Sequence, residues 1–385
     1  MCDLPCVYNA NNCLEGTPIK GRTFNILLLY CWQREYDKRP YKHFQFRRLD
    51  FEERMNRRYH CLRDFRTIVN FLLQRRLHSV SISSVVVSNW NARMLQDFVR
   101  SLLSVPKVEL KLMRLPHEFF VMLRLKVRQM KLRELSLEAT PLSERDVIML
   151  REVLLASGTL HTLNVASCSL NQYNFATLAD GVYKSSSMRS LNASRILGLT
   201  LTLDTEKITS IVGSLLMQNK LVELTMEHCD FVAQDMETVA EYLYSKSCSL
   251  RRLRLGYNRI AADGAMYLMR GMASGGKLEL LDISGNSIGS HGGEWIAKYF
   301  SSCLMLQHLH LNYNEIGAEA INLILLTLKK PCRMKRLTLY GNSFDACTAM
   351  IVRRLLDAEV VLHEEIDISY TYDEALQDYR IVPWR

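Results

Sequence analysis

Four segments repeat one pattern: LRRLRLGYNRI (250–260), LELLDISGNSI (278–288), LQHLHLNYNEI (306–316) and MKRLTLYGNSF (334–344). Their first positions are evenly spaced along the chain, with a constant step of 28. In a strand, successive side chains point to opposite sides, so the leucines of L-x-L face a core and the residues between them face solvent. The pattern therefore predicts a stack of short strands in register.

Each segment carries one asparagine after its predicted strand. These residues are Asn258, Asn286, Asn314 and Asn342. An asparagine amide has two donors and an acceptor, so in a buried turn it satisfies backbone groups of its own coil and the next. Cys168 and Cys229 hold the same position in two earlier segments. We expect these side chains to form a buried ladder.

Beyond each asparagine, apolar or small residues recur at steps of four. In the first segment they are Ile260, Gly264, Leu268 and Met272. This spacing places them on one helix face. We expect the small residue to let the helix sit close to the strand layer. Each repeat is then strand, turn, helix and turn, and stacking of neighbours supplies the stability.

The pattern L-x-x-L-x-L-x-x-N-x-I at a fixed step is the signature of leucine-rich repeats. A repeat of this length with a full helix resembles the ribonuclease-inhibitor type. The resemblance implies an α/β fold: a curved solenoid, or horseshoe, with a parallel sheet on the concave face and helices on the convex face. Earlier segments fit the pattern less closely: LHSVSISSVVV (77–87), VPKVELKLMRL (105–115), LRELSLEATPL (132–142), LHTLNVASCSL (160–170), MRSLNAS (188–194) and LVELTMEHCDF (221–231).

The N-terminal stretch 1–76 is the basic part of the chain. It holds twelve arginines and three lysines against eight acidic residues, a net +7 of the total +9. Residues 33–48 interleave basic and aromatic side chains, a pattern that suits an acidic protein, an anionic lipid surface or nucleic acid. We favour a terminal cap whose charges face water.

The cap interpretation rests on two further patterns. Phe46, Leu49 and Phe51 fit a degenerate strand, and Arg57 to Leu77 fits a helix. The predicted organisation is therefore a basic segment with a helical cap (1–76), the repeat solenoid (77–359) and a C-terminal cap and tail (360–385).

Two stretches depart from the regular repeat pattern. Between Met188 and Leu221 the step grows from 28 to 33, and the surplus falls in 194–205. A docking loop and a widened turn are both open interpretations of it. Asp204 and Thr205 would cap the next helix. In the tail, a strand near Glu365–Tyr370 and a partner near Tyr379–Val382 would close the core.

Composition bounds the class of protein. A hydrophobic fraction of 48% with only 8 prolines allows a large core and argues against long disorder. No stretch reads as a secretory signal or a membrane span. The 11 cysteines are scattered, and thiols at the ladder position favour a reducing compartment, so we expect a cytoplasmic protein.

The sequence predicts no enzyme, no cofactor and no metal. Phosphate-binding glycine loops, zinc-protease helices and nucleophile elbows are missing from the sequence. Cys2, Cys6, Cys13 and Cys31 fit no common zinc spacing. His308 and His310 share one strand face without an evident third ligand, so we interpret them as a solvated or partner-contacting pair.

The outward side chains of the strands are the candidate partner-binding residues. They are Arg251, Arg252, Arg254, Tyr257, Asp282, His308, His310, Tyr313, Lys335 and Tyr340. Tyrosine and arginine commonly anchor protein interfaces. The alternative is that Arg252 and Arg254 only pair with Glu279 and Asp282 on the next repeat.

The leading hypothesis is a non-enzymatic scaffold that binds another protein on its concave face and takes no small-molecule substrate. The chain looks most like cytoplasmic members such as the leucine-rich-repeat subunit of the axonemal nexin–dynein regulatory complex, which implies a cytoskeletal setting. The alternative is a GTPase-activating protein similar to the activator of Ran, with Arg145 or Arg195 acting on the GTPase. Ribonuclease inhibition is disfavoured, because a pI near 9.0 does not complement basic ribonucleases.

Overall fold

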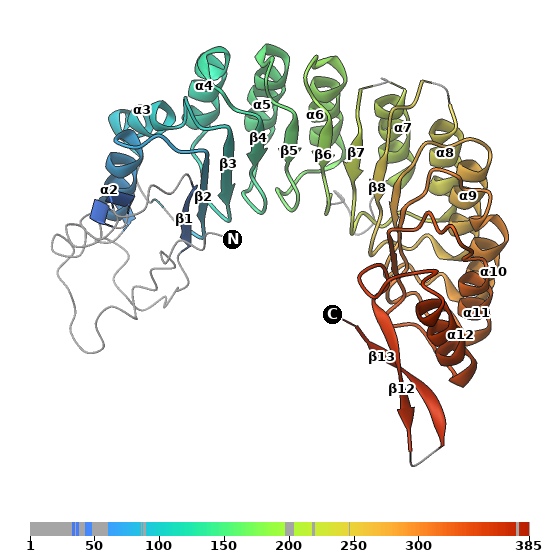
Figure 1. Ribbon diagram of the computed structural model, residues 1–385. Coiled ribbons are helices and arrows are strands. Elements are labelled where there is room, and N and C mark those ends of the chain that lie inside the picture. The colour runs from blue at the N-terminus through green and yellow to red at the C-terminus, as the bar shows by residue number, and fades with distance from the viewer. Residues whose placement is uncertain are drawn as a thin grey trace, which may run out of the picture. The chain divides into compact units, whose positions relative to one another are not determined.

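The computed structural model describes residues 33–34, 36–37, 43–47, 61–85, 87, 90–196, 204–217, 220–245, 247–374 and 377–384. The chain divides into two compact units, Met1–Met188 and Arg189–Arg385. Each unit is a row of strand–helix repeats, with a parallel sheet on one side and helices on the other (Figure 1). The predicted α/β repeat solenoid is therefore confirmed.

Unit 1 pairs its five strands in parallel and in chain order. The strands are β1 (His43–Arg47), β2 (Ser79–Ser83), β3 (Lys107–Lys111), β4 (Glu134–Ser136) and β5 (Thr162–Asn164). The helices are α2 (Cys61–Leu73), α3 (Ala92–Ser101), α4 (His117–Lys126), α5 (Glu144–Ala156) and α6 (Gln172–Lys184), with a 3₁₀ turn, η1, at Val127–Gln129. Ser143 caps α5 through a reciprocal box with Asp146, as the sequence predicts.

Unit 2 continues the same order with six parallel strands. They are β6 (Ser190–Asn192), β7 (Glu223–Thr225), β8 (Arg252–Arg254), β9 (Leu280–Asp282), β10 (His308–His310) and β11 (Arg336–Thr338). The helices are α7 (Thr205–Leu216), α8 (Ala233–Leu243), α9 (Ala261–Ala273), α10 (Gly289–Phe300), α11 (Ala318–Leu326) and α12 (Ala346–Asp357). Asp204 caps α7 by accepting from the Lys207 N–H at 3.2 Å, whereas residues 197–203 of the predicted insertion lie outside the described residues.

The asparagine ladder forms as predicted. The Asn286 side chain is fully buried. Its Oδ1 accepts from the Asn258 N–H at 3.1 Å, and its Nδ2 donates to the Leu255 and Ile283 carbonyls at 3.0 and 2.9 Å. Asn314 takes the next rung: its Oδ1 accepts from the Asn286 N–H at 2.7 Å. Each side chain thus joins its own turn to the preceding repeat.

Thiols and a hydroxyl replace the amide in earlier repeats. The Cys168 Sγ donates to the Leu137 carbonyl at 3.0 Å, and the hydroxyl of Thr140 donates to the Leu110 carbonyl at 2.8 Å. Burial raises the pKa of the Cys168 thiol to about 12 and that of Cys229 to about 11. Both therefore stay protonated at neutral pH, as hydrogen-bond donation requires. Cys248, Cys303, Cys332 and Cys347 are also free.

Two N-terminal boundaries differ from the sequence prediction. The first strand is His43–Arg47, and Phe44 and Phe46 are its buried residues because they alternate at the strand period. A strand framed on Phe46, Leu49 and Phe51 was therefore wrong, and the last two residues lie outside the described part.

The predicted helix ends too late. α2 stops at Leu73. Leu77 is not helical, because it is buried as the first inward residue of the next strand segment. Phe65, Ile68, Val69 and Leu72 are buried along one helix face as expected.

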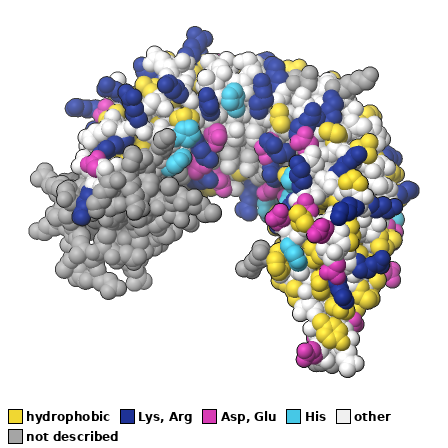
Figure 2. Space-filling model, in the orientation of Figure 1, with side chains coloured by type: hydrophobic (Ala, Val, Ile, Leu, Met, Phe, Trp, Pro, Cys, Tyr) yellow, Lys and Arg dark blue, Asp and Glu magenta, His cyan; other side chains and the backbone are white. Residues whose placement is uncertain are grey.

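The tail closes the end of unit 2. β12 (Ile368–Asp373) and β13 (Asp378–Pro383) form an antiparallel hairpin, which packs on α12. The carboxylate of Asp367 accepts from the Leu339 and Tyr340 N–H groups at 2.7 and 3.2 Å. It thus replaces the acceptors that a further repeat would supply to these N–H groups. Hydrophobic side chains gather over this end of the molecule (Figure 2).

Candidate protein-interaction face

All ten predicted partner-binding residues lie on or beside the sheet of unit 2. Register sets them in rows across adjacent strands. Arg254, Asp282, His310 and Thr338 are aligned in one row. Lys and Arg, acidic and histidine side chains are interspersed on this side of the unit (Figure 2). We call the outward side of β7–β11 and their following turns the sheet face.

Glu223 on β7 is the centre of the charged part. It lies directly opposite Arg252 in the sheet. Its Oε2 is 3.3 Å from the Arg252 Nε, and its Oε1 binds the Arg254 guanidinium. Burial works to raise the pKa of Glu223, but the two guanidinium groups hold it below its ordinary value. Glu223 therefore stays ionised and fixes both arginines.

This pairing corrects the predicted one. The alternative interpretation paired Arg252 and Arg254 with Glu279 and Asp282, but both bind Glu223 on the preceding strand. The residue opposite Arg252 on β9 is Leu280, which is buried and offers no charge. Arg251 instead meets Glu279, with 3.7 Å between Nε and Oε1, and donates to the Lys277 carbonyl at 3.2 Å.

Two carboxylates of the face have no ion-pair partner among the described residues. They are Glu227, in the turn after β7, and Asp282 on β9. A Cβ built on Gly256 would lie 3.8 Å from both the Glu227 Cγ and the Asp282 Oδ1, so the two acids flank one residue without a side chain. Burial, with the nearby Asp282 charge, raises the pKa of Glu227.

The two histidines of β10 project from the same strand, as predicted. The His310 Nδ1 lies 3.1 Å from the Thr338 hydroxyl. Burial lowers the pKa of both His308 and His310. In the part of the chain that the structure describes, no group of three His, Cys, Asp or Glu side chains is placed to hold a metal ion.

We expect the stability of the His310→Gln variant to fall less steeply than that of the wild type as the pH is lowered from 7 to 5. The pKa of His310 in the fold lies below its ordinary value of 6.5. The unfolded chain therefore binds more protons once the pH falls below about 6.5, and stability drops, by at most about 1.4 kcal/mol per pH unit for one proton. Urea unfolding between pH 7 and pH 5 measures this slope. An unchanged slope in the variant would contradict the role of His310.

Aromatic side chains line the turns that follow the strands. Tyr257 is 48% exposed and Tyr313 is 51% exposed. The Tyr257 ring stacks on His228 with 4.8 Å between centroids and covers Gly285, where a Cβ would lie 2.5 Å from the ring. Tyr313 covers Gly341 in the same way. The result is an exposed aromatic edge beside the charged strands.

Tyr340 and Lys335 lie just outside strand β11, not on it. Tyr340 lies one residue before the register of Tyr257 and Tyr313, because Gly341 takes that place. It still joins the edge, since its ring meets Tyr313 edge-on at 5.8 Å. Lys335 is exposed just before β11.

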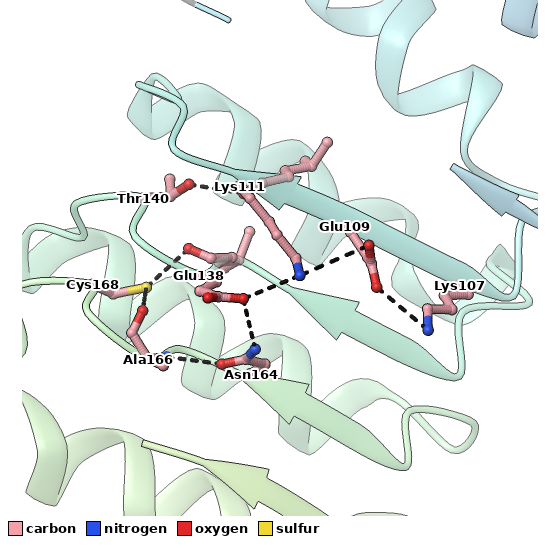
Figure 3. A network of polar contacts seen from close by, with 10 residues as sticks. Lys107, Glu109, Lys111, Glu138, Thr140, Asn164, Ala166 and Cys168 are labelled. Atoms are coloured by element: carbon pink, nitrogen blue, oxygen red, sulfur yellow. Dashed lines mark hydrogen bonds and ion pairs between the residues drawn. The ribbon is translucent and has the colours of Figure 1, made fainter. Parts of the chain in front are cut away.

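The outward face of unit 1 has a different character. Lys107 contacts Glu109 and Glu134, and Lys111 contacts Glu109 and Glu138, at 3.1 to 4.0 Å. Figure 3 shows the part of this network that joins Lys107, Glu109, Lys111 and Glu138. These two lysines and three glutamates form one connected network of ion pairs in which every charged group has a partner. The unit 1 face consequently offers less unsatisfied charge to a partner than the sheet face of unit 2.

The residues considered for GTPase activation are both exposed. Arg145 lies in the first turn of α5 in unit 1, and Arg195 lies in the turn after β6 in unit 2. Arg195 adopts a positive φ of 61°.

Comparison with known proteins supports the fold. A family model described as Leucine Rich repeat matches residues 246–269 and 302–324. The chain is 29% identical over 148 residues to mouse NACHT, LRR and PYD domains-containing protein 4B, which is 38% of this chain and 16% of that protein. It is 26% identical over 202 residues to mouse ribonuclease inhibitor, which is 52% of this chain and 43% of the inhibitor.

Among solved structures, an internalin from Listeria monocytogenes aligns at 18% identity with a TM-score of 0.40, over 73% of this chain and 72% of the internalin. The chain spans less than half the length of each of the two curated relatives. Strand–helix repeats at a constant step, together with the family match, define a leucine-rich-repeat protein. Its repeats are of the ribonuclease-inhibitor type.

Leucine-rich-repeat proteins generally act as protein-interaction scaffolds, and ribonuclease-inhibitor-like families are typically non-enzymatic. No helix in the described part of the chain is both long and apolar enough to cross a bilayer.

Proposed function

We propose that this protein is a non-enzymatic scaffold that binds a partner protein through the sheet face of unit 2. The observation that carries the proposal is the pair of exposed tyrosines at a turn position that is left-handed in every repeat, and that glycine holds in the repeat following each tyrosine. Tyr257 has a φ of 58° and Tyr313 a φ of 55°. Gly285 and Gly341 hold the equivalent places.

A tyrosine at such a position is unfavourable for the fold alone. A left-handed backbone costs a non-glycine residue about 1–2 kcal/mol. The side chains are half exposed, so their burial offsets only part of this cost. Large, rigid aromatic rings at a solvent edge are the residue type that anchors protein interfaces. Packing on His228, Gly285 and Gly341 leaves about half of each ring exposed, and partner binding would account for that exposed half.

The charged part of the face suggests what the partner presents. Arg254 forms its ion pair with Glu223, and the charges of Arg254 and Arg195 reach Glu227 only from beyond ion-pair distance. A basic side chain of the partner, entering over Gly256, would meet both carboxylates. Complementary charge of this kind adds specificity and speeds association.

We expect the Tyr257→Gly/Tyr313→Gly double variant to bind its partner at least about ten-fold more weakly. Stability should change little, because glycine relieves the backbone cost while the stacking is lost. Quantitative mass spectrometry of proteins that co-purify with the tagged full chain identifies partners, and calorimetry with the purified partner measures the dissociation constant. Tyr173→Gly, at an exposed tyrosine of α6 in unit 1, is the matched control.

Charge reversal of Lys335 provides a second test of the sheet face. Lys335→Glu changes an exposed side chain, whereas reversal at Arg254 would place a second carboxylate beside Glu223 and disturb the fold. If both the tyrosine variant and the Lys335 variant capture the same partners with wild-type affinity, the sheet face is not the binding surface.

A cytoskeletal or axonemal assembly is the setting we propose for this complex. The closing hairpin after the last repeat supports it through the resemblance to axonemal repeat proteins. Localisation of the tagged chain in ciliated cells tests the setting, and exclusion from the axoneme and the cytoskeleton would refute it.

A further inference from the structure

Helix α11 exposes leucines on its outer side. Its sequence, AEAINLILL, has one charged residue, Glu319. Leu323 is 48% exposed and Leu326 is 56% exposed. A helix that is apolar all round is normally covered on every side. α10 and α12 pack beside α11, and its own buried side chains face the core, so only the outer side lacks a cover among the described residues.

The neighbouring repeats serve as internal controls. The position of Leu326 is occupied by Arg270 in α9, Lys298 in α10 and Arg354 in α12, all exposed. A charged residue is therefore the norm at this place on the helix layer. Leucine departs from that norm in α11 alone among these four helices.

Further apolar side chains extend the patch. On α10, Trp295 lies at the position equivalent to Leu323. Its ring is held by the Trp295 Nε1 donating to His291 at 3.1 Å and by the Lys298 Nζ at 4.4 Å from the ring centroid. On α12, Met350 is exposed. We call Trp295, Leu323, Leu326 and Met350 the helix-layer patch.

The charges along α11 are opposite in sign at its two ends. Glu319 is exposed in the first turn, and Lys329 is exposed shortly beyond the last. A two-fold rotation about the midpoint between Leu323 and Leu326 would bring Glu319 close to Lys329 of a second copy. The same rotation sets Leu323 opposite Leu326. The patch is thus complementary to itself, which is the requirement for a symmetric dimer.

We propose that the helix-layer patch is a homodimer interface in which α11 packs antiparallel against α11 of a second copy. Leu323 and Leu326 form the apolar centre, with Trp295 and Met350 on the flanks. Glu319 and Lys329 pair at both ends. We expect a dissociation constant on the order of micromolar, which is typical of small, specific interfaces. The dimer leaves the sheet face free, so it is independent of the proposed function.

Sedimentation equilibrium of the full chain, from about 1 to 100 µM, tests the proposal across that affinity range. Wild type is expected to dimerise, and Leu326→Lys to raise the dissociation constant at least about ten-fold. Lysine is the residue of α10 at this position, so the variant should fold, as circular dichroism verifies. Leu125→Lys, at a 68% exposed leucine of α4 in unit 1, should leave the dissociation constant unchanged.

Charge-reversed variants test the geometry. Glu319→Lys and Lys329→Glu should each dimerise more weakly, because like charges then meet at both ends. An equimolar mixture of these two variants should recover dimers, because both ends of the heterodimer are again complementary. A monomeric wild type over the whole range would overturn the proposal and leave the patch to a different protein. Dimerisation of Leu326→Lys with wild-type affinity, or a mixture no stronger than its components, would also overturn it.

Discussion

The Asn286→Ala variant is expected to lose about 4 kcal/mol of unfolding free energy, because several buried backbone groups lose their partner together. Asn286 is fully buried and joins two repeats. The N–H of Asn258 and the carbonyls of Leu255 and Ile283 all bind its amide within 3.1 Å. Alanine has no polar atom in its side chain, so it would leave these buried backbone groups without a hydrogen-bond partner.

The measurement should follow both the whole chain and the site. Repeat arrays do not always unfold in one step, so urea denaturation is paired with hydrogen exchange of the β8–β10 amides. Asn312→Ala is the matched control: this asparagine lies two residues before the ladder, and its Oδ1 has no hydrogen-bond partner among the residues that the structure describes. A loss below about 1 kcal/mol in Asn286→Ala, equal to the control, would show that the ladder is not a main source of stability.

The second large effect is expected for Gly292→Val in α10, a destabilisation of about 3 kcal/mol. A Cβ at this position would collide with the Ile288 side chain and lie 2.9 Å from the Ala262 Cα in α9. Backbone cannot give way as a flexible side chain can. The small residue was expected to admit the helix to the strand layer, but the atoms that a Cβ would meet lie on Ile288 and on the neighbouring helix α9.

Glu294→Val is the control for this substitution. It adds the same β-branched residue to the same helix at an exposed site, so it reports the cost of valine in this helix without the collision. Thermal unfolding should separate the two variants clearly. Equal melting temperatures would mean that α9 and α10 move apart at little cost.

The regular repeat is what made so much of the fold predictable. One spacing fixed the strand leucines, the ladder asparagines and the buried helix face, because every repeat must match its neighbours to share a core. The terminal strand at His43–Arg47 was placed wrongly because a first repeat has no preceding neighbour to hold it to the pattern.

The pairing on the sheet face was harder to predict for two reasons. From Leu221 to Leu250 the step is 29, so counting by 28 does not bring Glu223 opposite Arg252. The outward row that the sequence indicates includes Glu223, Glu227 and His228, but the partner-binding residues chosen from it began at Arg251 and left these three out. The longer step was the signal that could have revealed Glu223. The stacking of His228 on Tyr257 depends on ring orientation, for which the sequence holds no signal.

The alternation of tyrosine and glycine at the turns has a consequence for how such a chain lengthens or shortens. Tyr257 lies over Gly285 and Tyr313 over Gly341, so the true unit along this edge is a pair of repeats. Excising a single repeat, 278–305, would bring Tyr313 into the place of Gly285 and drive its Cβ into the ring of Tyr257. We therefore expect gain or loss of repeats at this edge to be tolerated better in pairs than singly.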